Sequence, residues 1–223
     1  MRVLATFIDW GWAVDHRAEI ISRTAEHVKL TVEAVVIGLA ISLPLGIFAH
    51  RHPQWYTPIA SMAGIIYTIP SLALFVLLLP VTGISDVTVE IALVGYTLLI
   101  LIRNIVAGLA GVSPELKEAA TGMGYTSRQL LWRVELPLAL PVIWAGVRLA
   151  TISTIGLVTV ASLLGKGGLG QFILEGLRTF FTTETMLGAL FSVILAIAAD
   201  LLLMGAQRLM TPWAESRRKR VGA

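Results

Sequence analysis

The side chains that could do chemistry occur in three places along the chain. Residues 118–137, EAATGMGYTSRQLLWRVELP, are charged and lie between long apolar stretches, and residues 165–170 read GKGGLG. Two further charges, Arg148 and Asp200, are isolated within apolar stretches. The sequence has no cysteine, and its four histidines show no spacing that would hold a metal or activate a nucleophile. These residues predict a protein that is not an enzyme and binds no metal or other cofactor itself.

The GKGGLG segment matches the G-x-G-x-x-G pattern of dinucleotide-binding loops. Such a loop requires a preceding strand and a following helix in a βαβ unit, whereas an apolar stretch precedes it here. We interpret it as a flexible outer turn leading into a short helix at 170–178, and its glycines are candidates for an outer gate: Gly165, Gly167, Gly168 and Gly170. The chain also lacks the G-x-x-x-x-G-K-[ST] phosphate loop, so no ATP site is expected in it.

The composition indicates that these segments are held by membrane helices. Hydrophobic residues make up 56% of the 223 residues and charged residues 14%, whereas soluble domains have about 25% charged residues. Five apolar stretches are long enough to cross a bilayer: 28–49, 57–80, 87–110, 136–163 and 186–210. The predicted fold is all-α, a polytopic membrane protein with about five transmembrane helices and a cytoplasmic helical hairpin between the third and fourth.

The distribution of Lys and Arg predicts which ends of the helices face the cytoplasm. With the N-terminus outside, the inner segments carry ten basic residues and the outer segments six, in agreement with the positive-inside rule. Residues 1–27 then form an extracytoplasmic or interfacial leader without the features of a cleaved signal peptide. Residues 28–210 form the transmembrane domain, the loop at 111–135 is cytoplasmic, and residues 211–223, with RRKR at 217–220, form a basic cytoplasmic tail.

Local signals in residues 111–135 predict two short helices. Ser113 is a suitable N-cap for the first helix, and Pro114 fits its first position. Gly122 and Gly124 end this helix, because glycine lets the backbone turn at little steric cost.

The second helix of the hairpin begins at a capping box. Thr126 is followed three residues later by Gln129, the spacing at which the two side chains satisfy each other's backbone N–H groups. This helix is predicted to run until Pro137 opens the fourth span. The hairpin would form a compact knob on the cytoplasmic face, and the small pair Ala119 and Ala120 would let another protein approach it closely.

The spacing of this segment resembles the signature loop of ABC importer permeases, which share their fold with the methionine permeases. The pattern is E-A-A, three residues, G, nine residues, a β-branched residue, one residue and L-P, and it is met by Glu118, Ala119, Ala120, Gly124, Val134, Leu136 and Pro137. The resemblance implies that these residues, with Gly122, couple the chain to cytoplasmic ABC ATPase subunits that bind ATP and Mg. It also implies the inner membrane of a bacterial cell. A hairpin tethered to the bilayer at both ends does not suit a nucleic-acid reader, so no nucleic-acid partner is expected.

Longer stretches resemble the permeases of importers for quaternary-amine osmoprotectants. They include LTVEAVVIGLAISLPLGIFA (30–49), YTIPSLALF (67–75), ELPLALPVIWAGVRLAT (135–151) and LLGKGGLG (163–170). The resemblance implies glycine betaine, carnitine or choline as substrate, a second permease copy or a paralogue, and an extracytoplasmic substrate-binding protein. Lys166 departs from this branch, in which a small residue is expected. Importers of ergothioneine or methionine are the alternatives within the family.

Polar residues within the spans are candidates for the translocation path or for buried structural contacts. The aromatic and hydroxyl candidates are Tyr67, Ser71, Tyr96 and Trp144, for which ordinary helix packing is the alternative. Arg148 and Asp200 each cost roughly 2.5–3.5 kcal/mol at the centre of a membrane helix, and each lies about 17 Å from the inner end of its span. We expect both to face the protein interior, where they either pair or find separate polar partners.

A transporter driven by an ion gradient, or a channel, is the main alternative from another functional class. Such a protein would use intramembrane carboxylates such as Asp200 and would give the hairpin at 111–135 no energetic role. Dependence of uptake on an ATPase subunit distinguishes the two classes.

Overall fold

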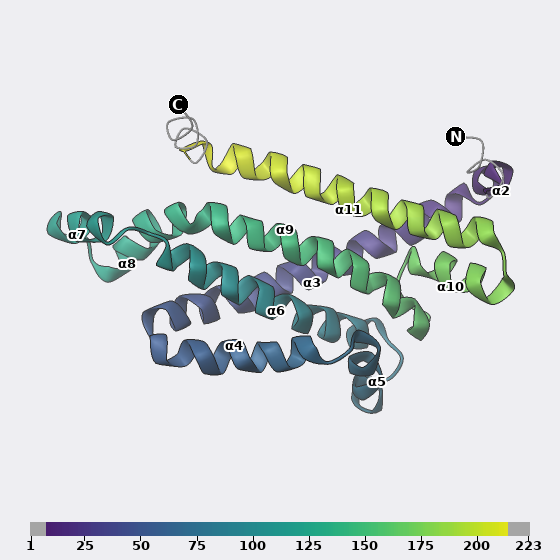
Figure 1. Cartoon of the computed structure of the whole chain (residues 1–223), viewed down its shortest axis with the longest axis horizontal. Coiled ribbons are helices and arrows are strands. Elements are labelled where there is room, and N and C mark those ends of the chain that lie inside the picture. Colours follow the sequence, from purple (N-terminus) through teal and green to yellow (C-terminus); the bar gives the residue numbers. More distant parts are fainter. Residues whose placement is uncertain (1–7, 214–223) are drawn as a thin grey trace.

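Long apolar helices make up most of the computed structural model, which describes residues 8–213 (Figure 1). Four helical stretches are long and apolar enough to cross a membrane: α3 (Arg17–Arg51), α6 (Asp86–Ala110), residues 127–164 with α9 (Leu136–Ala161), and α11 (Thr182–Met210). A fifth span results if α4 (Pro53–Thr68) and α5 (Ser71–Thr82) are counted as one. The described residues contain no β-strand, which confirms the predicted all-α membrane fold.

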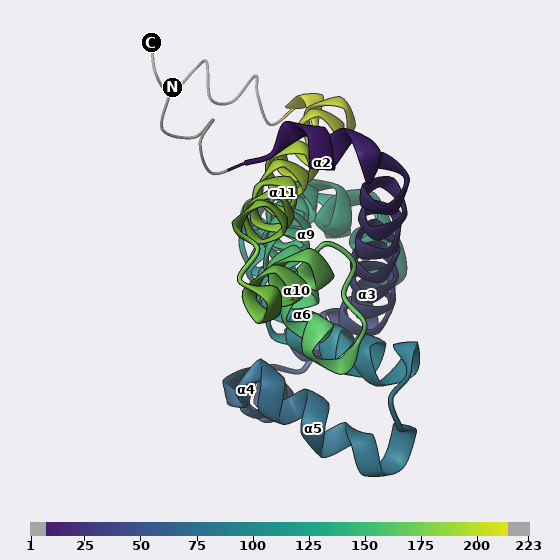
Figure 2. The same cartoon turned by 90° about the vertical axis from the view of Figure 1, so that its right-hand side faces the viewer.

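The core of the bundle is α6, which packs against both α3 and α9. In Figures 1 and 2, α4 lies along α6 on one side, while α11 lies along α9 on the other. In the most apolar window of α6, 61% of the residues are buried, against 17% in α11. The buried side chains of α6 include Val89, Leu93, Leu101 and Ile105, all 0% exposed. The outer face of α11 is therefore available to lipid.

The two ends of the bundle carry different elements. The hairpin helices α7 (Pro114–Gly122) and α8 (Ser127–Leu130) protrude at one end, together with the α3–α4 corner. At the opposite end lie α2 (Trp10–Asp15), α5 and α10 (Gly170–Thr179). The helix expected at 170–178 is thus confirmed, and it lies far from the hairpin (Figure 1).

Glycines allow α3 to approach α6 closely. A Cβ at Gly38 would lie 1.9 Å from Thr97 Oγ1, and a Cβ at Gly46 would lie 2.6 Å from Ile105 Cγ2. No side chain fits at either position without movement of α6. Since lipid gives little hydrophobic drive for association between helices, such close contact supplies the attraction that holds these two spans together.

The second span is broken, which corrects the prediction of one continuous helix over 57–80. α4 and α5 are bent by 96° at residues 69 and 70. Pro70 has no N–H to donate and disfavours the helical conformation of the residue before it. Ile69 accordingly has an extended backbone, with φ −66° and ψ 129°. The break gives the bundle an irregular wall at this point.

The second hairpin helix continues into the fourth span without a break. A π-helix over Leu131–Glu135 joins α8 to α9, and the Leu136 N–H donates to the Leu131 carbonyl five residues earlier. Pro137, which has no N–H, follows this wider turn near the start of α9. The helical stretch from residue 127 to residue 164 is consequently 38 residues long.

The N-terminal region packs onto the end of the bundle that carries α10. Asp9 caps α2 by accepting hydrogen bonds from the Gly11 and Trp12 N–H groups, and the Asp9 N–H donates to Thr183 Oγ1 at 3.0 Å. Helix α3 begins at Arg17, so the second half of the predicted leader (1–27) continues into the first span. The RRKR segment and the rest of the tail from residue 214 lie outside the described residues.

Candidate functional site

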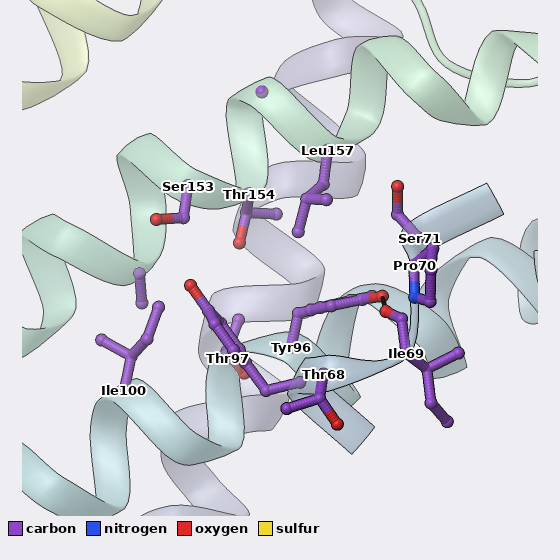
Figure 3. Close-up of a pocket in the computed structure, with 13 residues that line it drawn as sticks. Thr68, Ile69, Pro70, Ser71, Tyr96, Thr97, Ile100, Ser153, Thr154 and Leu157 are labelled. Atoms are coloured by element: carbon purple, nitrogen blue, oxygen red, sulfur yellow. Dashed lines mark hydrogen bonds between the residues drawn. The ribbon is translucent and has the colours of Figure 1, made fainter. Parts of the chain in front are cut away.

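A cavity of about 480 Å³ lies where the second span is broken. Its walls come from the α4–α5 break, from α6 and from α9 (Figure 3). The lining residues are Tyr67, Thr68, Ile69, Pro70, Ser71, Tyr96, Thr97, Ile100, Ala150, Ser153, Thr154, Gly156 and Leu157, all of them uncharged. A mostly apolar cavity with a few polar groups has the usual composition of a small-molecule site.

Two tyrosines define the aromatic side of the cavity. The rings of Tyr67 and Tyr96 meet edge to face, with centroids 5.7 Å apart and an interplanar angle of 66°. The Tyr96 hydroxyl donates to the Ile69 carbonyl, which the broken helix leaves without a helical partner (Figure 3). This bond ties α6 to the break and fixes the orientation of the Tyr96 ring.

Hydroxyl groups lie across the cavity from the tyrosines, on α9. The Thr154 side chain is 1% exposed, and its hydroxyl has no hydrogen-bond partner within residues 8–213. In Figure 3 the Thr154 oxygen points toward the side on which Thr97 and Tyr96 lie, and Ser153 is its neighbour on the same wall. A buried hydroxyl without a partner is unusual in proteins, so Thr154 is a candidate ligand contact.

The structure separates the predicted path residues into two groups. Tyr67, Ser71 and Tyr96 all line the cavity. Trp144 does not: its indole N–H donates to the Leu203 carbonyl at 2.7 Å and joins α9 to α11. Sequence reasoning missed Thr154, which was one of many small polar residues in the apolar spans.

Arg148 and Asp200 pair with each other between α9 and α11. Arg148 Nε lies 2.8 Å from Asp200 Oδ1, and Arg148 Nη2 lies 2.9 Å from Asp200 Oδ2. The side chains are 26% and 30% exposed. This bidentate geometry is the strongest form of a guanidinium–carboxylate contact. Neither residue lines the cavity, so the pair serves here as a connection between the two helices.

The hairpin is built as predicted at its turn and at its second cap. Gly124 has φ +85°, a conformation that favours glycine. Thr126 and Gln129 form both bonds of the capping box. Ser113 occupies the N-cap position of α7, but its side chain caps no helical N–H. The pKa of Glu115 is lowered instead, because the backbone N–H of Glu115 and the Ser113 hydroxyl donate to that carboxylate.

The predicted coupling residues of the hairpin differ in exposure. Glu118, Ala119, Gly122 and Gly124 are exposed, whereas Ala120 is 2% exposed and packs inward. Two side chains beside this surface, Leu116 and Met123, are apolar and are 42% and 71% exposed. Leu136 and Pro137 are partly buried at the base of α9. The hairpin thus presents small and apolar residues, together with the charged Glu118, beyond the ends of the spans.

An ionic cluster connects the base of the hairpin to α3. Lys117 Nζ lies 2.9 Å from Glu135 Oε1, and His50 Nε2 lies 3.8 Å from the same oxygen. Glu135 is only 7% exposed. Arg51 Nη2 also donates to the Ser127 carbonyl at 3.0 Å. These contacts join α7 and α8 to the end of the first span.

The glycine turn at 165–170 is closely packed, which corrects its interpretation as a flexible turn. A Cβ at Gly168 would lie 2.5 Å from the Arg23 carbonyl oxygen, and a Cβ at Gly170 would lie 2.4 Å from the Thr159 carbonyl oxygen. The left-handed φ angles are those of Gly165 (+73°), Gly167 (+133°) and Gly168 (+50°). The turn is therefore fixed against α3 and α9.

Lys166 adds a charged contact to this turn. Its Nζ lies 2.9 Å from Asp86 Oδ1 at the start of α6. The Asp86 carboxylate raises the pKa of Lys166 through the hydrogen bond and the opposite charge. Lys166 thus links the glycine turn to the central span.

The fold is that of a multi-pass membrane protein with a cavity among its spans. The profile of the family described as "Binding-protein-dependent transport system inner membrane component" matches residues 42–216. The chain belongs to this family, and it is a multi-pass membrane protein.

Named relatives and a solved structure agree with this assignment. The chain is 38% identical over 201 residues to the choline transport system permease protein OpuBB of Bacillus subtilis, covering 90% of this chain and 93% of the relative. It is 37% identical over 206 residues to the osmoprotectant import permease protein OsmW of Salmonella typhimurium, covering 90% and 96%. The MetNI methionine ABC transporter in inward-facing conformations contains a chain with the same fold, at a TM-score of 0.81 and 22% identity over 88% of this chain and 98% of that one.

Proposed function

We propose that the chain is the translocation subunit of an ATP-driven importer of quaternary-amine osmoprotectants of the glycine betaine, carnitine and choline type. ATP and Mg are bound by partner ATPase subunits, and the chain catalyses no reaction itself. The observation that carries the proposal is the similarity over 90% of the chain to permeases named for choline and for osmoprotectants. Ergothioneine or methionine as substrate remains the alternative within the family.

The hairpin is the contact for the ATPase in this proposal. Its exposed small residues Ala119, Gly122 and Gly124, with the charged Glu118 beside them, suit insertion into a groove of another protein. The capping box and the ionic cluster at Glu135 make the hairpin stiff and attach it to two spans. Closure of the ATPase subunits on ATP would move the hairpins and thereby the spans, provided that the motor binds the two states with different affinity.

The complex proposed here contains two permease chains, as a homodimer or with a paralogue, two ATPase subunits and an outer substrate-binding protein. The N-terminus lies outside and the hairpin in the cytoplasm, because the inner segments carry the larger number of basic residues. The cavity between Tyr67, Tyr96 and Thr154 lies on the translocation path, since it is an uncharged space with polar groups at a break in a span.

The pairing of Asp200 disfavours an ion-driven transporter. A carboxylate that binds a driving ion must present its oxygens to that ion, whereas both Asp200 oxygens are held by Arg148. The described residues also contain no group of three or more His, Cys, Asp or Glu side chains that could hold a metal ion.

Uptake of labelled substrate tests the proposal. The permease is expressed with its operon's ATPase and binding protein in cells that lack other osmoprotectant uptake systems, and accumulation of labelled glycine betaine, carnitine and choline is measured. A strain whose ATPase has its phosphate-loop lysine replaced is the control. We expect accumulation that the control abolishes. Uptake that persists in the control and is abolished by a protonophore would establish the ion-driven alternative instead.

A further inference from the structure

The cavity has an aromatic pole that suits a quaternary ammonium group. Tyr67 and Tyr96 form its aromatic side: both line the cavity, and their rings meet edge to face. The Tyr96 hydroxyl is engaged with the Ile69 carbonyl, so this ring is fixed before any ligand arrives. A cation without N–H groups cannot donate hydrogen bonds and is attracted by the faces of aromatic rings.

A second part of the cavity wall, the second pole, suits a carboxylate. Helix α5, with 12 residues, begins at Ser71 in the cavity wall, and within the described chain no side chain caps its N-terminus. The first N–H groups of a helix carry a partial positive charge and attract anions. Thr154 provides an independent observation, because its buried hydroxyl has no partner and lines the same cavity. A carboxylate oxygen would accept a hydrogen bond from that hydroxyl.

The charge of the cavity restricts the ligand further. None of its lining residues is ionisable at neutral pH as a carboxylate, lysine, arginine or histidine. A ligand with a net positive charge would therefore be transferred into a low-dielectric space without a counter-charge, which is strongly unfavourable. A zwitterion is neutral overall, and its two charged groups match the two poles.

We infer that the cavity binds a zwitterionic quaternary ammonium compound, with the ammonium against Tyr67 and Tyr96 and the carboxylate at the start of α5 and the Thr154 hydroxyl. The permease itself then favours glycine betaine and carnitine over choline, which has the ammonium group but no carboxylate. This inference deepens the proposed function and rests on it.

The test is direct binding to the purified permease–ATPase complex in lipid nanodiscs without the binding protein. Equilibrium binding of labelled glycine betaine and labelled choline is measured up to millimolar concentration. We expect glycine betaine to bind at least about tenfold more tightly, because one hydrogen bond to a charged group contributes about a factor of ten or more. Equal affinity, tighter binding of choline, or no binding of glycine betaine would overturn the inference.

Variants of α9 test the contact between the Thr154 hydroxyl and the carboxylate of the ligand. Thr154→Val should weaken glycine betaine binding about tenfold and change choline binding less than twofold, while Thr154→Ser, which keeps the hydroxyl, should restore it. Thr151→Val is the matched control, because the Thr151 hydroxyl donates to the Val147 carbonyl of its own helix and does not line the cavity. If Thr154→Val left glycine betaine binding unchanged, or if Thr151→Val weakened it equally, the assignment would be wrong.

ATP-driven uptake by the complete transporter separates this inference from the proposed function. If the wild type accumulates quaternary amines but the isolated complex does not discriminate between the two ligands, only the inference fails. If the complete transporter accumulates no quaternary amine, the proposed function fails and the inference fails with it.

Discussion

Removal of the Asp200 carboxylate should loosen α11 from the bundle. All four buried residues of α11 lie in its first half: Thr183, Leu187, Gly188 and Ser192. Beyond them the polar contacts of α11 to α9 include the Arg148–Asp200 pair, the Trp144–Leu203 bond and the bond from Gln207 to the Pro141 carbonyl. We predict that Asp200→Asn destabilises the docked state of α11.

The expected magnitude follows from the environment of the pair. Breaking a buried ion pair costs about 3–5 kcal/mol, and an unpaired charge at the centre of a membrane helix costs roughly 2.5–3.5 kcal/mol. The side chains here are 26% and 30% exposed, so hydration of the freed Arg148 reduces the effect to about 2 kcal/mol. That corresponds to roughly a 30-fold shift in the docking equilibrium.

This effect is measured by heating the purified protein and using size-exclusion chromatography to determine the fraction that stays folded at each temperature. We expect Asp200→Asn to lower the midpoint by about 4–8 °C, from about 2–4 °C per kcal/mol for a chain of this size. The double variant Arg148→Met with Asp200→Leu should recover most of the loss, because it leaves no unpaired charge. Equal midpoints for Asp200→Asn and wild type, or a double variant less stable than the single one, would refute the reasoning.

Three further predictions concern other contacts. Gly46→Leu should destabilise the protein by about 1–3 kcal/mol, because it overpacks the α3–α6 contact, whereas Gly205→Leu, with no atom within 4 Å of its Cβ, should keep the wild-type unfolding midpoint. Glu135→Gln should reduce uptake about fivefold, or about 1 kcal/mol, while ATP hydrolysis by the complex continues; unchanged uptake would show that the ionic cluster has no part in coupling. The raised pKa of Lys166 means that its ion pair with Asp86 persists at neutral pH and is lost only as the pH rises above about 10.5. The difference between the unfolding midpoints of Lys166→Met and the wild type should therefore stay constant between about pH 6 and 9. A difference that changes within that range would contradict the Lys166–Asp86 ion pair.

The features that the sequence could predict are those decided by local chemistry. The spans follow from hydropathy, because a backbone in lipid must satisfy its hydrogen bonds within a helix. The turn at Gly124 and the capping box of Thr126 and Gln129 follow from preferences of a few adjacent residues. From the sequence, Arg148 and Asp200 could either pair with each other or find separate polar partners. Equal depth in the bilayer does not fix the faces on which two helices present their side chains, so the sequence could not decide between these outcomes.

The features that could not be predicted depend on contacts between distant segments. Proline occurs in many membrane helices without a sharp bend, so Pro70 alone did not indicate the 96° break. The cavity combines residues of α4, α5, α6 and α9, and the importance of Thr154 arises only from the absence of a partner around it within residues 8–213. The packed glycine turn was misjudged because the carbonyl groups of Arg23 and Thr159 that crowd it are remote in sequence.

The π-helical joint at residues 131–135 makes α8 continuous with α9, which forms one wall of the cavity. The uninterrupted helix from residue 127 to residue 164 has 38 residues and is about 57 Å long at ~1.5 Å per residue. Ser153 and Thr154 lie on the same rod as Ser127, whereas α7 is attached to it through the Gly124 turn. A tilt imposed on α8 would therefore be passed along one continuous helix toward these two hydroxyl groups. The shape of the cavity would then depend on the position of a helix that lies outside the bundle.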